Sequence, residues 1–464
     1  MPPALASLAF DPANPSAALA GLPQSQAVFA LYGADARAEP YIGRTPNLRA
    51  RLERLLQPSA QHPRRLHLAG LVRTIRWQLT GSEFESLLAQ FSLLEAIYGA
   101  KALERMHLRA PAFVRFLGSN PYPRIAVTNR PSRREADWVY GPFASRAAAE
   151  RFADEALKLF LLRRCSDDLA PDPGHPGCIY SEMKMCLAPC YKGCSDERYA
   201  EEAAAVEGFL ASRGESRLIP LRAARDRASE ELAFESAAAL HAQIQRVEAV
   251  RALAAELVRP LSRLSAVILQ PSATPDEVAV FLFEDGCLRG PAAFSTLGMR
   301  IQNENSGSTS LFAQPIALEP VPESQGPSDR GNEETGDRAN RGAGIGPDTS
   351  EAALKGHDGS RAGDDPINRR DSVPEDGSAP ARVFRGRLES RLEAALAELS
   401  APAVAATATV RQGHLALLKR WYYRPEAKRS GEIFFPDAAG SWPVKAILRG
   451  IGRVAANSWK LARE

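Results

Sequence analysis

The chain has 464 residues, 45% of them hydrophobic and 24% charged, and it carries a formal net charge of +3. This composition is close to the globular average, so it excludes a wholly disordered chain and predicts roughly two to four domains. No apolar run approaches the roughly 18 residues of a membrane span, no basic residue precedes Arg37 as in a signal peptide, and six Cys are too few for a disulfide scaffold. We therefore expect a cytoplasmic protein that contacts no membrane.

The first hundred residues predict a small α/β domain. Short apolar runs that end in turn residues indicate strands, and apolar residues at helical spacing indicate helices. The predicted order is strand, strand, helix, strand, helix, over residues 27–32, 40–43, 47–56, 74–79 and 82–98. Ser82 is the expected N-cap of the last helix, and Leu87, Phe91, Leu94 and Tyr98 mark its buried face.

Residues 44–76 form a strongly basic segment. They include eight Arg and a single acidic residue, Glu53. A local field this positive favours a phosphate or another polyanion, and Arg suits bidentate phosphate contact. The alternative is a solvated helix face.

A Cys-rich stretch follows a Pro-rich region and a predicted helix at 145–163. Residues 111–145 contain five Pro and one candidate strand at 124–128. Cys165, Cys178, Cys186 and Cys190 then follow with the spacing C-x12-C-x7-C-x3-C. Four thiols this close together in a reducing compartment indicate a soft-metal centre, either an iron–sulfur cluster or a structural zinc. The alternative is a coincidental set of free thiols, which is our expectation for Cys194 and Cys287.

The composition of the second half of the chain changes twice along the sequence. Residues 196–258 predict helices with a break near 214–220, and residues 264–295 alternate like strands. Residues 303–382 are rich in Gly, Ser, Pro and charged residues, which predicts a disordered insert. The basic segment 384–464 regains helices and a strand at 432–435. Its aromatic residues either stack on nucleic acid or form the core of a small accessory domain.

Three short motifs lie near the N-terminus: Ala27-Val28-Phe29, Tyr41-Ile42-Gly43 and Asn47-Leu48-Arg49-Ala50-Arg51. Together they resemble the GIY-YIG nuclease module of the UvrC excinuclease family. The resemblance continues downstream over roughly residues 20–300. It includes Tyr140-Gly141-Pro142-Phe143, Leu161-Leu162-Arg163-Arg164-Cys165, Met185-Cys186-Leu187-Ala188-Pro189-Cys190, and a helical stretch at 228–247 similar to the UVR motif.

The resemblance implies a cofactor and two partners. It favours a four-iron four-sulfur (4Fe-4S) cluster over zinc on Cys165, Cys178, Cys186 and Cys190. It implies binding of damaged double-stranded DNA, for which Asn47, Arg49 and Arg54 are the candidate contacts. It also implies binding of a UvrB-like excinuclease protein through the UVR motif, where the matching candidate residues are Leu232, Phe234, Glu235, Leu240 and Ile244.

The nuclease site matches the family only in part. Tyr41, Arg51 and Arg44 match the family's Tyr, helix Arg and basic position, and an active module would use Mg²⁺ or Mn²⁺. Phe29 stands where the family has Tyr, and Gln90 stands where it has the metal-binding Glu. Since a neutral amide is a poor ligand for a hard cation, whether the chain is an enzyme stays open. The alternatives are a degenerate homologue that binds DNA and partners, or an iron–sulfur sensor.

We therefore predict an α+β, multidomain protein. Family members continue into an RNase H-like nuclease, and residues 264–295 resemble its beginning, but 384–464 offers no convincing set of carboxylates for two-metal hydrolysis. The expected parts are a GIY-YIG nuclease-like domain (20–105), a linker and Cys-rich region (106–195), a helical region with the UVR motif (196–258), a β-rich segment (259–302), the disordered insert (303–382) and a basic α/β segment (383–464).

Overall fold

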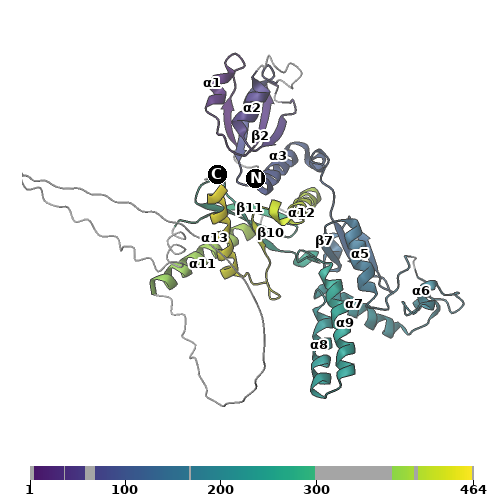
Figure 1. Ribbon diagram of the computed structural model, residues 1–464. Coiled ribbons are helices and arrows are strands. Elements are labelled where there is room, and N and C mark those ends of the chain that lie inside the picture. The colour runs from purple at the N-terminus through teal and green to yellow at the C-terminus, as the bar shows by residue number, and fades with distance from the viewer. Residues whose placement is uncertain are drawn as a thin grey trace, which may run out of the picture.

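The computed structural model describes residues 5–35, 37–57, 68–166, 169–297, 379–401 and 406–461. In this part of the chain the strands form three four-stranded sheets, and every strand pairing is antiparallel (Figure 1). The predicted mixture of helices and sheets is therefore confirmed. The predicted insert lies outside the described residues, except for 379–382, which begin a helix.

The N-terminal module contains the first sheet, whose strand order is β1-β4-β2-β3. All five predicted elements are present, and Ser82 caps the last helix by accepting a hydrogen bond from the Glu85 N–H. Two further elements, β1 and α1, precede them and were not predicted. The elements are β1 (Ala6–Ala9), α1 (Pro15–Ala20), β2 (Ala27–Gly33), β3 (Tyr41–Thr45), α2 (Leu48–Leu56), β4 (Val72–Leu79), α3 (Glu83–Tyr98), η1 (Gly99–Lys101) and α4 (Ala102–Arg105).

The middle region contains the second sheet, with strand order β6-β5-β7-β8, and a long helical hairpin. Helix α5 ends at Leu157 rather than continuing to residue 163 as predicted, yet Phe160 and Leu162 beyond its end are buried in the same core. The elements are β5 (Ala112–Phe116), β6 (Ile125–Thr128), η2 (Arg133–Trp138), β7 (Val139–Phe143), α5 (Arg146–Leu157), α6 (Ile179–Glu182), η3 (Pro189–Tyr191), α7 (Asp196–Ala211), α8 (Glu215–Glu230), α9 (Phe234–Ala252) and β8 (Arg259–Pro260).

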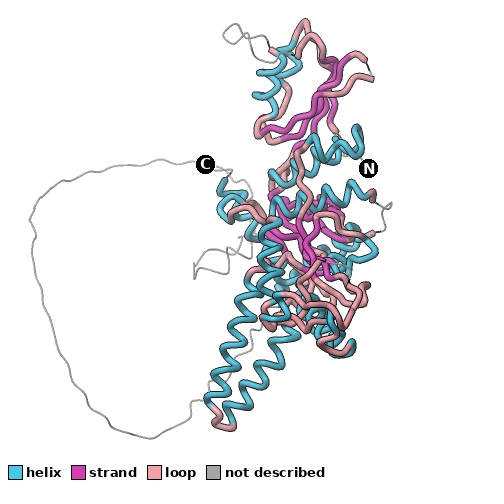
Figure 2. Tube along the Cα trace, turned by 90° about the vertical axis from the view of Figure 1, so that its right-hand side faces the viewer, coloured by secondary structure: helices cyan, strands magenta, loops and turns pink. Residues whose placement is uncertain are grey.

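Helices α8 and α9 run side by side and project from the body of the protein (Figures 1 and 2). The predicted helix break is a tight turn at Gly214, whose φ of 90° is left-handed and suits a residue without a Cβ. The base of the hairpin packs through Ile244, Val247 and Val250 into the core of the middle region. The tip is therefore the part that remains free of the rest of the described chain.

The C-terminal domain is built on the third sheet, with strand order β11-β10-β9-β12. One face is covered by α11 and α13, and the other by α12 together with α3 of the N-terminal module. Trp421 is buried in this second core, which favours the accessory-domain interpretation for that aromatic residue. The elements are η4 (Leu261–Arg263), β9 (Ala266–Pro271), β10 (Glu277–Glu284), β11 (Cys287–Ser295), α11 (Ala379–Ser400), α12 (Ala408–Tyr422), η5 (Glu426–Lys428), β12 (Glu432–Phe434) and α13 (Val444–Leu461).

Helix α3 thus joins the N-terminal module to the C-terminal domain, and we call this contact the α3 seam. Its Phe84 ring lies 5.3 Å from the rings of both Phe281 and Trp421, and its Phe91 ring lies 5.6 Å from that of His414. The predicted buried face of α3 is confirmed for Leu87, Phe91 and Leu94, whereas Tyr98 is only partly buried, and the face packs on the C-terminal sheet. None of the described helices is both long and apolar enough to span a membrane.

Candidate functional site

Tyr41 and Arg51 lie together at the start of β3 and the first turn of α2. Asn47 begins the helix, because its side chain accepts a hydrogen bond of 3.0 Å from the Ala50 N–H. This places the Arg51 guanidinium over the strand, where Nη2 donates to the Tyr41 hydroxyl oxygen at 3.3 Å. A half-exposed guanidinium beside a phenol can donate to phosphate oxygens.

Phe29 lies beneath this pair and adds no polar group. Its ring is completely buried, 6.1 Å from the Tyr41 ring. The ring also fills the space over Gly43, since a Cβ there would come within 2.7 Å of it. The Phe29 position is therefore a hydrophobic core position in this chain.

Gln90 belongs to the opposite side of the sheet. Its neighbours Ala89 and Leu93 pack on Val28 and Ala30, whereas Phe29 and Tyr41 face the core under α2. The Gln90 side chain is half-buried and hydrogen-bonds to no other described residue. No described acidic side chain pairs with Tyr41 or Arg51 either, so the residues present there do not fit a divalent cation.

Arg44 is engaged away from the Tyr41–Arg51 pair. It lies opposite Val28 in the β2–β3 ladder, which puts it on the α3 face, and its Nη1 is 3.2 Å from Glu83 Oε1. Glu83 also forms a bidentate salt bridge with Arg424, whose Nη1 and Nη2 atoms donate to the two carboxylate oxygens at 2.6 and 2.8 Å. Hydrogen bonding to Arg424, supported by Arg44, holds the pKa of the Glu83 carboxyl below its usual value. The pairing of Glu83 with Arg424 was not predicted, because 341 residues separate them.

The candidate DNA contacts on α2 differ in the hydrogen bonds that their side chains already make within the chain. Asn47 is occupied as the helix cap, and Arg49 Nε donates to the Leu22 carbonyl oxygen at 2.7 Å. Arg54 Nε donates to the Ala50 carbonyl oxygen of its own helix, in an exposed position. Within the basic segment, Arg64 and Arg65 lie outside the described residues.

Cys165, Cys178, Cys186 and Cys190 line one small cavity in the middle region. The Ala188 N–H donates to Cys186 Sγ at 3.3 Å, and Arg163 Nη1 lies 3.6 Å from Cys165 Sγ. Burial raises the pKa of the Cys186 thiol to about 11, and the other three cysteines add to the rise. Cys194 does not line this cavity.

This donor set fits a soft-metal centre in chemistry but not in spacing. Four thiols around one cavity, with N–H donors aimed at sulfur, are what an iron–sulfur or zinc centre requires. Across the described ranges, however, no three His, Cys, Asp or Glu side chains have the spacing of a bound metal ion. Binding of a metal would displace the thiol protons and draw the four sulfur atoms together.

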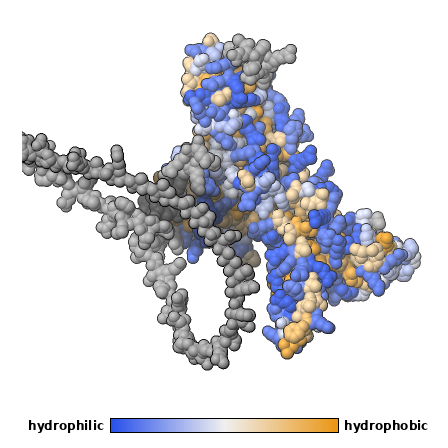
Figure 3. Space-filling view, in the orientation of Figure 1, coloured by the Kyte–Doolittle hydropathy of each residue, from blue (hydrophilic) through white to orange (hydrophobic). Residues whose placement is uncertain are grey.

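The hairpin tip exposes two large apolar side chains. Leu232 is 70% exposed and Phe234 is 66% exposed, at the turn between α8 and α9. Glu235 is also exposed, Leu240 is half-buried, and Ile244 is buried in the core at the hairpin base. In the space-filling view, apolar colour gathers at the end of the projecting hairpin (Figure 3).

Comparison with known proteins places the middle region in a recognised family. Residues 113–209 match the family described as "UvrC/Cho excinuclease, middle domain", and this match contains all four cavity-lining cysteines. The chain is 29% identical over 211 residues to the UvrABC system protein C of Alcanivorax borkumensis, which covers 46% of this chain and 34% of the relative. It is 27% identical over 278 residues to the protein of the same name from Ruminiclostridium cellulolyticum, covering 59% of this chain and 44% of the relative.

The similarity is thus limited to part of each protein. The chain spans less than half the length of these curated relatives. No solved structure matches the chain significantly.

Proposed function

Because this chain is a member of the UvrC family, we propose that it acts in nucleotide excision repair by binding damaged DNA and a UvrB-like partner. The observation that carries this proposal is the free hairpin tip with its exposed Leu232 and Phe234. Exposed aromatic and aliphatic side chains on a rigid hairpin are suited to fill pockets on a partner. The basic residues of the N-terminal module would contact the DNA backbone.

Phosphodiester hydrolysis is the second candidate function, and the Tyr41–Arg51 pair favours it. In that role Arg51 would hold the phosphate and Tyr41 would assist the attacking water. Phe29 and Gln90 remove a hydroxyl and a carboxylate from the family pattern, and the described residues at the site supply no ligands for a divalent cation. We therefore propose that the module binds DNA without cutting it.

A nicking assay on damaged duplex DNA tests this proposal. Anaerobically purified protein is combined with UvrA-like and UvrB-like partners and either Mg²⁺ or Mn²⁺. We expect no nicking by the wild-type protein, although it binds the DNA. Nicking that Tyr41→Phe abolishes would contradict us and assign an active nuclease. Activity that appears only in Gln90→Glu would show that a single lost carboxylate inactivated the site.

We also propose that the four cavity-lining cysteines hold a 4Fe-4S cluster, with zinc as the alternative. Such a cluster would supply a redox-active or structural centre to the middle region. The contacts of Ala188 and Arg163 with cysteine sulfur support the proposal, because such donors stabilise thiolate ligands.

Cys186→Ser is expected to remove the visible absorption of anaerobically purified protein and most of its iron and sulfide. Cys194→Ser is the matched control, because this thiol is near in sequence but lies outside the cavity, and it should retain both signals. If the wild-type protein is colourless and contains one zinc per chain, the four cysteines hold zinc and not an iron–sulfur cluster. If oxidising the bound cluster changes DNA affinity, the sensor hypothesis gains support.

A further inference from the structure

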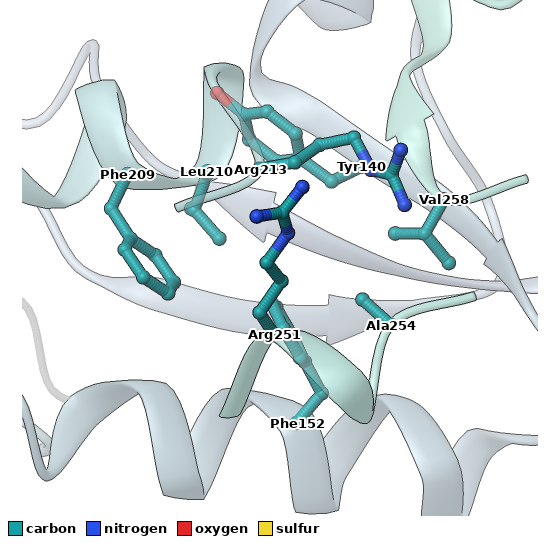
Figure 4. A pocket seen from close by; sticks show the side chains of 8 residues that line it. All are labelled: Tyr140, Phe152, Phe209, Leu210, Arg213, Arg251, Ala254 and Val258. Atoms are coloured by element: carbon teal, nitrogen blue, oxygen red, sulfur yellow. The ribbon is translucent and has the colours of Figure 1, made fainter. Parts of the chain in front are cut away.

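Three arginines gather where the hairpin base meets the rest of the chain, and we call them the arginine seam. Arg213 follows α7, Arg251 lies in the last turn of α9, and Arg259 begins β8. Arg213 and Arg251 line the same pocket, and their guanidinium groups lie near each other over its apolar wall (Figure 4). Three different segments of the chain thus bring their positively charged side chains together in one region.

The seam has more positive charge than its carboxylates can neutralise. Glu215 contacts Arg251 at 2.5 Å, whereas Arg222 is 3.8 Å from Glu215 and pairs more closely with Glu248 at 2.8 Å. Glu256 lies 3.6 Å from Arg259, and its side chain is largely exposed to water, so this pair is weak. Burial lowers the pKa of the Arg213 guanidinium; Glu256 opposes this effect and the nearby Arg251 adds to it. Burial and Arg213 lower the pKa of Arg259 in the same way.

Arg213 also has unused hydrogen-bonding capacity. Its Nε atom is buried and has no partner among the described residues. Its Nη2 donates to the Ala255 carbonyl oxygen at 3.5 Å, the outer limit for such a bond. If Arg213 served only to neutralise the negative end of the α7 helix dipole, no second arginine would be needed beside it. A buried, under-satisfied donor therefore points to a missing acceptor.

The C-terminal domain forms the other side of the seam. The Arg259 guanidinium lies over the Phe435 ring at 4.4 Å, and Arg259 Nη1 donates to the Pro436 carbonyl oxygen at 3.4 Å. Arg429 lies over the Tyr422 ring at 5.4 Å and adds a fourth positive charge to the same region. The charge therefore faces a junction of domains rather than a single helix.

We propose that Arg213, Arg251 and Arg259 bind a phosphate group of the DNA backbone at the base of the hairpin. The pocket beneath Arg213 and Arg251 has a volume of about 20 Å³, which is enough for one water molecule, so the phosphate would lie on the guanidinium groups at its mouth rather than inside it. A phosphodiester carries one negative charge and accepts paired hydrogen bonds from a guanidinium. This inference rests on the proposed DNA binding and assigns it a second contact, separate from the N-terminal module.

The salt dependence of DNA binding tests the inference. Labelled duplex DNA is titrated with wild-type protein and with Arg213→Gln and Arg251→Gln at several salt concentrations. Each variant is expected to lower the slope of log affinity against log salt by about one. Arg227→Gln is the matched control, because Arg227 lies exposed on the same hairpin and should leave the slope unchanged. Arg213→Lys keeps the positive charge but cannot donate two parallel hydrogen bonds as a guanidinium does. It should therefore preserve the salt dependence and weaken the affinity for DNA.

Different outcomes reject different proposals. An unchanged slope in both Gln variants, with wild-type binding intact, overturns this inference and leaves the seam as a structural ion cluster. Failure of the wild-type protein to bind DNA overturns the proposed function and this inference together. Thermal unfolding separates lost binding from lost folding. If Arg213→Gln does not fold, a Lys variant that binds as tightly as wild type overturns the proposed phosphate contact.

Discussion

Replacing Gly81 by Ala is expected to destabilise the protein by about 3 kcal/mol, because it forces the α3 seam apart. A Cβ at this position would lie 2.2 Å from the Ser272 carbonyl carbon and 2.3 Å from the Pro271 carbonyl oxygen. Both atoms belong to the backbone of the C-terminal domain, so no side-chain rotation can relieve the clash. Thermal unfolding measures the loss, and faster hydrogen exchange in α3 and α12 locates it.

Gly21→Ala is the control for this substitution. Gly21 ends α1, has ordinary helical backbone angles and has no atom within 4 Å of the position a Cβ would take. The same change of residue should therefore leave the midpoint of unfolding almost unchanged. Equal stability of Gly81→Ala and wild type would show that the N-terminal module does not pack on the C-terminal domain in solution.

Replacing Leu232 by Gly is expected to stabilise the hairpin and weaken binding of the UvrB-like partner. Leu232 has a left-handed φ of 58°, which costs a residue with a Cβ about 1 kcal/mol relative to Gly. Its side chain is largely exposed, so its removal loses little packing within the chain. Affinity for the partner should fall by about 2 kcal/mol, which is roughly thirtyfold, and further with Phe234→Ala. Calorimetry on the purified pair measures it.

Ile219→Ala tests whether the effect belongs to the hairpin tip. Ile219 is exposed to nearly the same extent but lies near the base of α8, so its loss should not change the affinity. If Leu232→Gly and Phe234→Ala both bind the UvrB-like partner as wild type does, the hairpin is not the contact surface.

Local patterns predicted most elements of the N-terminal module. Residues 27–33 and 41–45 are short apolar strands that end in turns, and helix α3 carries both a capping residue and an apolar face. The prediction failed at α5, because Phe160 and Leu162 continue its apolar pattern after the helix has ended. Short strands such as β1 and β8 were missed because their pairing comes from distant parts of the chain.

The candidate sites were predictable only where the residues are close in sequence. The four cysteines lie within one short stretch, and the structure does place them around one cavity. By contrast, the pairing of Glu83 with Arg424 and the convergence of Arg213, Arg251 and Arg259 depend on how whole domains pack. Spacing along a single sequence carries no signal of such contacts.

The α3 seam has a consequence for the order in which the protein is made. Glu83 and Arg424 are 341 residues apart, so at about 5–20 residues per second the ribosome needs roughly 20–70 seconds to deliver the partner of α3. During that interval Phe84 and Phe91 lack the aromatic side chains of α12 that cover them in the folded protein. The newly made N-terminal module therefore exposes an apolar surface until synthesis reaches α12, and such a surface favours aggregation during that interval.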